Sequence, residues 1–146
     1  YVRSIRFVNT HVLVTGELNE SSLLDALRHG RSFIAFDMIA DARGFVFLAE
    51  SQGDKAVMGE AKPFRSGMQL KAESPCEVHF TLLRDGEKVQ EEVGRRLTFM
   101  PETPGNYRVE ARLLVNGAWV PWIYTNPIRL TAATDADTVK DSTVVN

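Results

Sequence analysis

The stretch PGNYRVEARLLVNGAWVPWIYTNPIRL, residues 104–130, decides the fold of this chain. Its first half alternates an apolar set with the charged residues Arg108, Glu110 and Arg112. That apolar set is Tyr107, Val109, Ala111, Leu113 and Val115. Because successive side chains of a strand point to opposite faces, we expect the apolar set to be buried and the charged set to be exposed to solvent. Asn116-Gly117 favours positive φ at both turn positions, so it predicts a hairpin onto the returning residues 119–124.

The same signals recur along the rest of the chain. Asp85-Gly86 stands between β-rich segments and predicts another hairpin. Apolar segments at 32–39 and 44–50 are joined by turn residues 41–44, so we expect an antiparallel pair there. Residues 52–67 carry scattered Gly, Lys, Pro and Ser, which is typical of a long loop with at most a short strand near Val57-Met58. Further short strands are expected at 2–14, 68–73, 97–100 and 128–130.

One segment near the N-terminus reads as a helix. Asn19 or Ser21 can cap its free amide groups, and Gly30 can adopt the left-handed conformation that ends a helix. Its apolar face is made of leucines at helical spacing, Leu23, Leu24 and Leu27. A short amphipathic helix is marginal in water by itself, so we expect these leucines to pack on the strands.

Short strands with turns between them, one helix and no βαβ rhythm define a mostly β class. We expect an immunoglobulin-like β-sandwich of about seven to nine antiparallel strands with one short helix near the N-terminus. Residues 1–31 form the lead-in strands and helix, 32–132 the sandwich, and 133–146 a polar tail. Tyr107 resembles the tyrosine corner of sandwich folds, whose hydroxyl ties down a neighbouring loop.

Composition narrows the classes of function. Hydrophobic residues make up 44% and charged residues 25% of the chain, as in an ordinary globular domain. The net charge is −2 and no basic stripe occurs, so we expect no nucleic-acid partner and no membrane partner. No apolar run approaches the roughly 20 residues of a membrane span. Cys76 is the single cysteine, so no internal disulfide can form, and cysteine content does not indicate a cellular compartment.

Three phrases carry a resemblance to a known family. They are Leu23-Leu24-Asp25-Ala26-Leu27-Arg28-His29-Gly30-Arg31-Ser32, the PGNYRVE run at 104–110, and the PWIYTNPI run at 121–128. In order and spacing they resemble the "ALRAGRxY", "PGxYRVEV" and "PWxxTNPI" phrases of bacterial PHP-type metallohydrolases, the polymerase and histidinol phosphatase superfamily. The resemblance spans roughly residues 4–130. It implies a C-terminal β-sandwich appended to a metal-dependent phosphoesterase domain, so we expect this chain to be part of a longer protein.

The resemblance implies a neighbouring catalytic domain and implies no catalytic activity for this chain itself. Catalysis in that family depends on His-x-His pairs that hold metal ions, and this sequence has no His-x-His. We therefore predict no catalytic, cofactor-binding or metal-binding residues here and no cofactor. The expected role is a non-catalytic accessory domain that packs on, or modulates, the upstream catalytic domain of the same polypeptide. The helix would be the joint, with Glu20, Arg28 and His29 able to meet that partner.

Two alternatives stay open. In the first, Trp119, Trp122 and Tyr124 form a surface that recognises carbohydrate or protein, in a free-standing module. A regular strand turns Trp119 away from the other two, so a common platform needs a bulge at Pro121, and core packing is favoured.

In the second alternative, His29 joins Asp37 or Asp41 in a metal site, because imidazole and carboxylate are usual ligands for zinc or manganese. The spacing is not diagnostic. The favoured interpretation of His29 is a residue at the helix C-terminus, where partial positive charge is stabilised.

Overall fold

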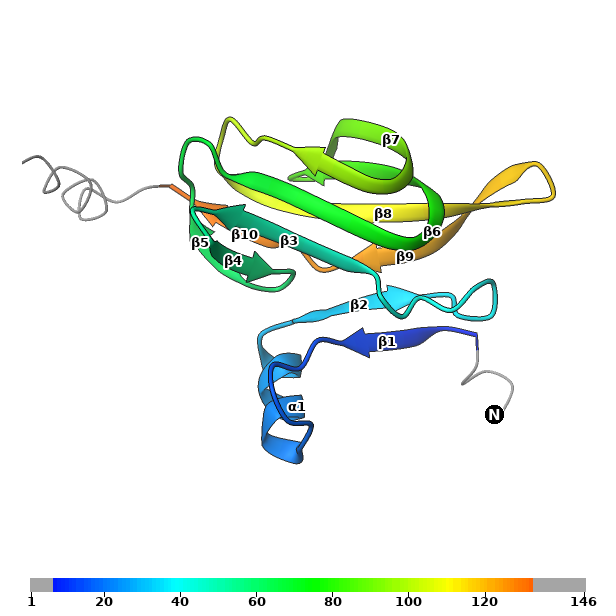
Figure 1. Cartoon of the computed structure of the whole chain (residues 1–146), viewed down its shortest axis with the longest axis horizontal. Coiled ribbons are helices and arrows are strands. Elements are labelled where there is room, and N and C mark those ends of the chain that lie inside the picture. The colour runs from blue at the N-terminus through cyan, green and yellow to red at the C-terminus, as the bar shows by residue number, and fades with distance from the viewer. Residues whose placement is uncertain (1–6, 133–146) are drawn as a thin grey trace, which may run out of the picture.

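The computed structural model describes residues 7–132 of the chain. Its single helix and ten strands follow one another in the order shown in Figure 1. They are β1 (Asn9–Val12), α1 (Glu20–Arg28), β2 (Ser32–Ala35), β3 (Val46–Ser51), β4 (Asp54–Val57), β5 (Ala61–Pro63), β6 (Gln69–Arg84), β7 (Glu87–Phe99), β8 (Gly105–Val115), β9 (Ala118–Thr125) and β10 (Ile128–Thr131). The prediction of a mostly β chain with one helix near the N-terminus is confirmed. The immunoglobulin-like sandwich arrangement stays a prediction.

The strands form one hydrogen-bonded sheet built around β6. Its path runs β1-β2-β9-β8-β6-β3-β4, with β7 beside β6 and with β10 and β5 beyond β8. The N-terminal part of β6 pairs with β3 and its C-terminal part pairs with β8. Strand β7 accompanies both parts, and the register shifts between Glu73 and Val78. Pro75 lies inside that shift, where a residue without an amide proton is tolerated in a ladder.

The turn signals at the two hairpins were correct. Asp85 and Asn116 have φ of 49°, and the glycines after them have φ of 86° and 80°. Asp and Asn tolerate the left-handed region better than most residues, which is why both dipeptides close tight turns. Each hairpin joins neighbouring antiparallel strands, β6 to β7 and β8 to β9.

Two sequence expectations about the first half were wrong. Residues 52–67 are not one long loop, because they contain β4 and β5. The short strand expected near Val57-Met58 corresponds to the end of β4, whereas β5 is too short to give a periodic signal. The segments 32–39 and 44–50 do not pair with each other. β2 pairs with β1 and β9, whereas β3 pairs with β4 and β6. β2 and β9 pair across about 90 residues, and β3 pairs with β6 across about 20, so the turn composition at 41–44 alone cannot reveal these partners.

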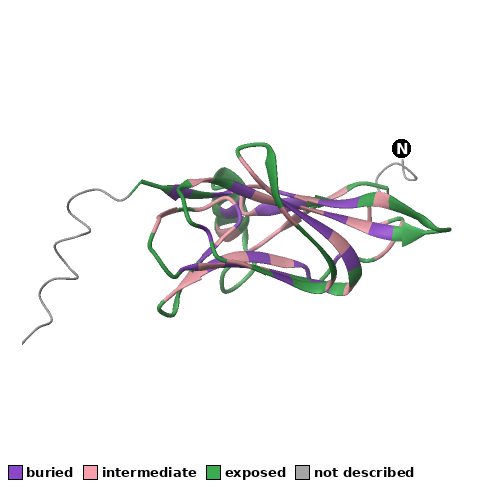
Figure 2. Cartoon of the chain, turned by 90° about the horizontal axis from the view of Figure 1, so that it is seen from above, coloured by how far each residue is buried: buried purple, intermediate pink, exposed green. Residues whose placement is uncertain are grey.

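A single cluster of apolar residues forms the core and draws on nearly every strand. Buried positions alternate with exposed ones along the strands in Figure 2. On β8 the apolar set is buried as predicted except Val115, which is 38% exposed at the hairpin end. The hydroxyl of Tyr107 donates to Thr103 O at 2.7 Å, so the predicted hydrogen bond from this tyrosine to a neighbouring loop is present.

The helix boundaries match the sequence signals. Asn19 is the N-cap and forms a capping box with Ser22: Asn19 Oδ1 accepts from Ser22 N at 2.9 Å and Ser22 Oγ accepts from Asn19 N at 3.0 Å. His29 is the C-cap, and Gly30 follows with φ of 67°, the left-handed conformation that glycine adopts without strain. Within the described chain this helix stands apart from the strands (Figure 1).

Candidate interdomain interface at helix α1

The leucine face of α1 is open to solvent. Leu23, Leu24 and Leu27 are 37%, 42% and 47% exposed, and Leu18 just before the helix is more exposed still. Ala26 is the buried residue of the helix. The expectation that the leucines pack on the strands is therefore wrong. The C-terminal end of the helix lies next to β2, and its N-terminal end points away from the sheet (Figure 1).

The attachment begins with a close approach of two glycines. A Cβ placed on Gly59 would lie 2.2 Å from Gly30 O and 2.5 Å from His29 O, so only glycine fits there. Gly59 also has φ of 89°, which independently favours glycine. Its amide donates to Pro127 O at 2.8 Å. The turn between β4 and β5 thus touches both the end of α1 and the turn between β9 and β10.

Asn126 completes the attachment from the β9–β10 turn. Its Nδ2 donates to Gly30 O at 2.9 Å and to Ser32 Oγ at 3.0 Å. These contacts join residues more than 90 positions apart in the sequence. The segments 23–32 and 121–128 therefore meet in space at this one junction.

Ion pairs surround the same junction. Arg31 binds Asp25 through Nη2 and approaches Glu60 through Nη1 at 3.4 Å. Glu60 Oε2 in turn accepts from Val57 N at 2.9 Å. The Arg31 side chain is 16% exposed, so it is a largely buried cation with two carboxylates near it. Removing either carboxylate would leave part of a buried charge uncompensated.

A hollow of about 320 Å³ opens beside this junction. It is lined by Leu27, Arg28, His29, Gly30, Gly59, Asn126, Pro127 and Arg129. Of the residues predicted to face a partner domain, Arg28 and His29 line the hollow, and Glu20 lies at the other end of α1. Their contact with another domain stays a prediction.

The aromatic residues of β9 do not share one surface. Trp122 is fully buried and its Nε1 donates to Ala40 O at 2.9 Å, so its place in a recognition surface is wrong and core packing is correct. The register against β8 slips by one residue at this point, so that Ile123 is buried beside Trp122. Trp119 is 38% exposed, with its ring 5.5 Å from that of His79. Tyr124 is half-buried and meets Phe36 edge-on at 6.4 Å.

The structure does not bring His29 to Asp37 or Asp41. His29 Nδ1 lies 2.9 Å from Asp25 O within its own helix, so the idea of a metal site there is wrong. Asp41 instead binds Arg43, which lowers the pKa of this exposed carboxyl to about 2 through hydrogen bonds. Across residues 7–132 no three His, Cys, Asp or Glu side chains gather to hold a metal ion.

Asp37 has a different histidine partner, which sequence reasoning missed. His11 Nε2 donates to Asp37 Oδ2 at 2.7 Å and Asn9 Nδ2 donates to the same oxygen at 2.8 Å. Burial raises the pKa of Asp37, but hydrogen bonds from Asn9, His11 and the Ala42 amide outweigh it, so the pKa is lowered overall. The β1–β2 pairing sets His11 opposite Phe33, where the two rings stack at 4.8 Å. The cluster ties β1 to the loop after β2, and nothing in the spacing of these residues could have revealed it.

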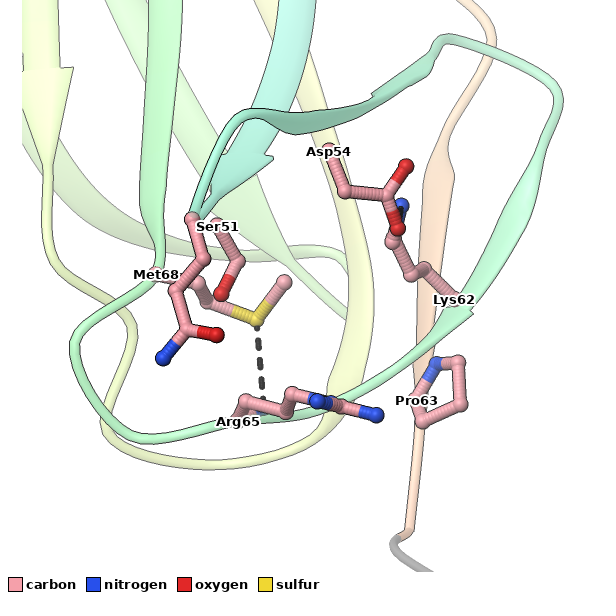
Figure 3. Close-up of a pocket in the computed structure, with 7 residues that line it drawn as sticks. Ser51, Asp54, Lys62, Pro63, Arg65 and Met68 are labelled. Atoms are coloured by element: carbon pink, nitrogen blue, oxygen red, sulfur yellow. Dashed lines mark hydrogen bonds and ion pairs between the residues drawn. The ribbon is translucent and has the colours of Figure 1, made fainter. Parts of the chain in front are cut away.

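A second, smaller hollow lies between the β3–β4 turn and β5 (Figure 3). Ser51, Gln52, Asp54, Lys62, Pro63, Arg65 and Met68 line about 200 Å³ of space. Lys62 is paired with Asp54, which lowers the pKa of that carboxyl through a hydrogen bond and charge attraction. The Arg65 amide donates to Met68 Sδ at 3.3 Å and fixes the floor of the hollow. Asp54 compensates Lys62, which leaves the exposed end of Arg65 as the one uncompensated charge in this lining within the described residues, and a single guanidinium selects no particular ligand.

Comparison of the chain with known protein families, with characterised proteins and with solved structures finds no match. The nine-residue helix α1, the sole helix in the described range, is too short and too polar to cross a membrane. Function must therefore be argued from the surfaces above.

Proposed function

We propose that this chain is a non-catalytic accessory domain and that α1 docks it on the catalytic domain of the same polypeptide. The observation that carries the proposal is the exposed leucine face of a helix whose end is firmly anchored. The resemblance of the junction phrases to PHP-type proteins suggests that the partner is a metal-dependent phosphoesterase domain.

The energetics favour a partner for that face. Fully burying one leucine side chain contributes about 1.5–3 kcal/mol, and each of these leucines retains more than a third of its exposed surface. A helix of nine residues gains little from its own hydrogen bonds, so its persistence depends on packing. Covalent linkage raises the effective concentration of a neighbouring domain to about the millimolar range, so a modest apolar contact is enough to dock it.

Hydrogen exchange tests the proposal directly. The measurement compares this chain alone with the full natural polypeptide. We expect amides of α1 to exchange more slowly in the polypeptide, because docking suppresses local opening. Leu24→Ser with Leu27→Ser should remove that extra protection while leaving the chain alone folded. Leu114→Ser is the matched control, since Leu114 is equally apolar and exposed but lies on β8. Equal protection of α1 in both proteins would exclude the docking role.

The alternative function is recognition of carbohydrate or protein through Trp119. Its favouring observation is the exposed indole beside His79, an arrangement that can stack on a sugar ring. Trp122 is buried, so a ligand at the surface would change the fluorescence of Trp119 alone. Titration with oligosaccharides should give a quench that Trp119→Phe abolishes. No spectral change with any sugar class tested would leave the accessory role as the better explanation.

A further inference from the structure

We infer that the hollow at the C-terminal end of α1 receives a carboxylate of the docking partner, and that the partner segment is an acidic residue flanked by apolar ones. The hollow is the one lined by Leu27, Arg28, His29, Gly30, Gly59, Asn126, Pro127 and Arg129. The inference rests on the proposed function for the identity of the partner. The charge and shape of the hollow indicate which chemical groups the partner segment presents to it.

Two guanidinium groups in this lining have no carboxylate partner within residues 7–132. Arg28 and Arg129 make no ion pair there, whereas the neighbouring Arg31 is bound by both Asp25 and Glu60. The lining holds no acidic side chain among the described residues. Asp25 and Glu60 are engaged with Arg31, and the lining contributes two arginine side chains, each with a full positive charge. Arg129 also donates through Nη2 to Gly59 O at 3.4 Å. A guanidinium fork matches a carboxylate with two parallel hydrogen bonds.

The helix end does not cancel this positive charge. The C-terminus of a helix carries about half a negative elementary charge, located on its unpaired carbonyls. Three of the last four helix carbonyls accept hydrogen bonds: Asp25 O from His29 N, Ala26 O from Arg31 N, and Leu27 O from Gly30 N. Gly30 O is also taken, by Asn126 Nδ2. An incoming anion therefore meets the guanidinium groups and few free carbonyl lone pairs.

The apolar part of the lining defines the rest of the ligand. Leu27 belongs both to the hollow and to the exposed leucine face of α1, so the two surfaces are continuous. Pro127 adds a further apolar group to the lining. A partner segment that covers Leu24 and Leu27 with apolar side chains would therefore place an adjacent Asp or Glu at the hollow.

The test uses short peptides as probes of this chemistry. The folded chain, labelled with ¹⁵N, is titrated with N-acetyl-Leu-Glu-amide, and with N-acetyl-Leu-Gln-amide as the uncharged control. One ion pair and one leucine contact predict a dissociation constant on the order of millimolar. We expect shifts of the Gly30 and Gly59 amides with the acidic probe. Binding should weaken at least about tenfold in Arg28→Gln with Arg129→Gln, a loss of about 1.4 kcal/mol. Arg95→Gln on β7 is the matched control.

Salt provides a second measurement that needs no variant. Affinity for the acidic probe should fall as ionic strength rises, because screening shortens the Debye length to about 8 Å at physiological salt. Equal shifts with both probes, or no shift of Gly30 and Gly59 up to tens of millimolar probe, would overturn the inference.

Failure of this inference can be told from failure of the proposed function. If α1 is protected in the full polypeptide but the acidic probe gives no response, only the carboxylate site is rejected and the docking role is retained. A probe response without protection rejects the docking role and leaves the hollow as a site for a free acidic peptide.

Discussion

Gly59 offers the sharpest test of how α1 is attached. In Gly59→Ala the new methyl group would sit 2.2 Å from Gly30 O and 2.3 Å from Gly30 C. Both are backbone atoms, so the contact can be relieved only by moving the end of α1 away from the β4–β5 turn. Overpacking of this kind costs about 1–3 kcal/mol, and a non-glycine residue at a φ of 89° costs about 1–3 kcal/mol more. We expect a total loss of unfolding free energy of about 2–6 kcal/mol.

The control is Gly53→Ala in the β3–β4 turn. Gly53 has φ of 81°, close to that of Gly59, but no atom lies within 4 Å of the position of its new Cβ. This variant therefore carries the backbone strain without the clash. Urea unfolding followed by circular dichroism gives both free energies, and the difference between them isolates the contact with Gly30. A difference near zero would refute the close approach and, with it, the view that α1 is held by its C-terminal end.

The other predictions concern the core, the Asp37 cluster and the absence of catalysis. Leu113→Ala should lower the free energy of unfolding, measured in urea, by about 2–5 kcal/mol because its side chain is buried. The neighbouring Leu114→Ala should lower it far less because that side chain is 58% exposed. Equal losses would mean that the buried and exposed faces of β8 are wrongly assigned. The lowered pKa of Asp37 means that its stabilisation is complete above the ordinary carboxyl pKa near 4 and is lost as the pH falls through its folded value. Asp37→Asn should therefore destabilise the chain at pH 7 and flatten the decline of stability in acid. Asp41→Asn, which breaks an exposed ion pair, should change the stability little at pH 7. An unaltered dependence of stability on acid pH in Asp37→Asn would contradict the stabilising role of the Asp37 carboxylate. The purified chain should hydrolyse neither a generic phosphomonoester nor a phosphodiester with added manganese or zinc, and turnover that survives repurification would overturn the accessory role.

Local signals predicted local structure well. Asn19, Gly30 and the Asp-Gly and Asn-Gly pairs act through their own backbone preferences, so the helix ends and hairpins could be placed from sequence. The alternation on β8 likewise gave its buried face. β4 was indicated only at its end near Val57, and β5 was not predicted, because a strand of three residues shows too few positions for a period to emerge.

The site depended on contacts that no local signal contains. The leucine stripe predicted an amphipathic helix correctly, but a stripe does not say which surface covers it. Arg28 and His29 were placed at the helix end correctly, while the contact of Gly30 with Gly59 and Asn126 arises from strand pairing. Pairing across 26 residues likewise brought His11 to Asp37. A bulge against β8 then buried Ile123 beside Trp122, which interrupts the regular alternation of β9.

The junction at Gly30 also has a consequence for the order of folding. The β6–β7 hairpin is closed by a two-residue turn, so it can form early from neighbouring parts of the chain. The Asn126 contacts with Gly30 and Ser32 close loops of more than 90 residues, and loop closure of that length delays contacts until most of the chain is in place. We therefore expect the end of α1 to be among the last parts to become fixed. A partner that recognises this end would therefore engage finished copies of the domain and pass over incompletely folded ones.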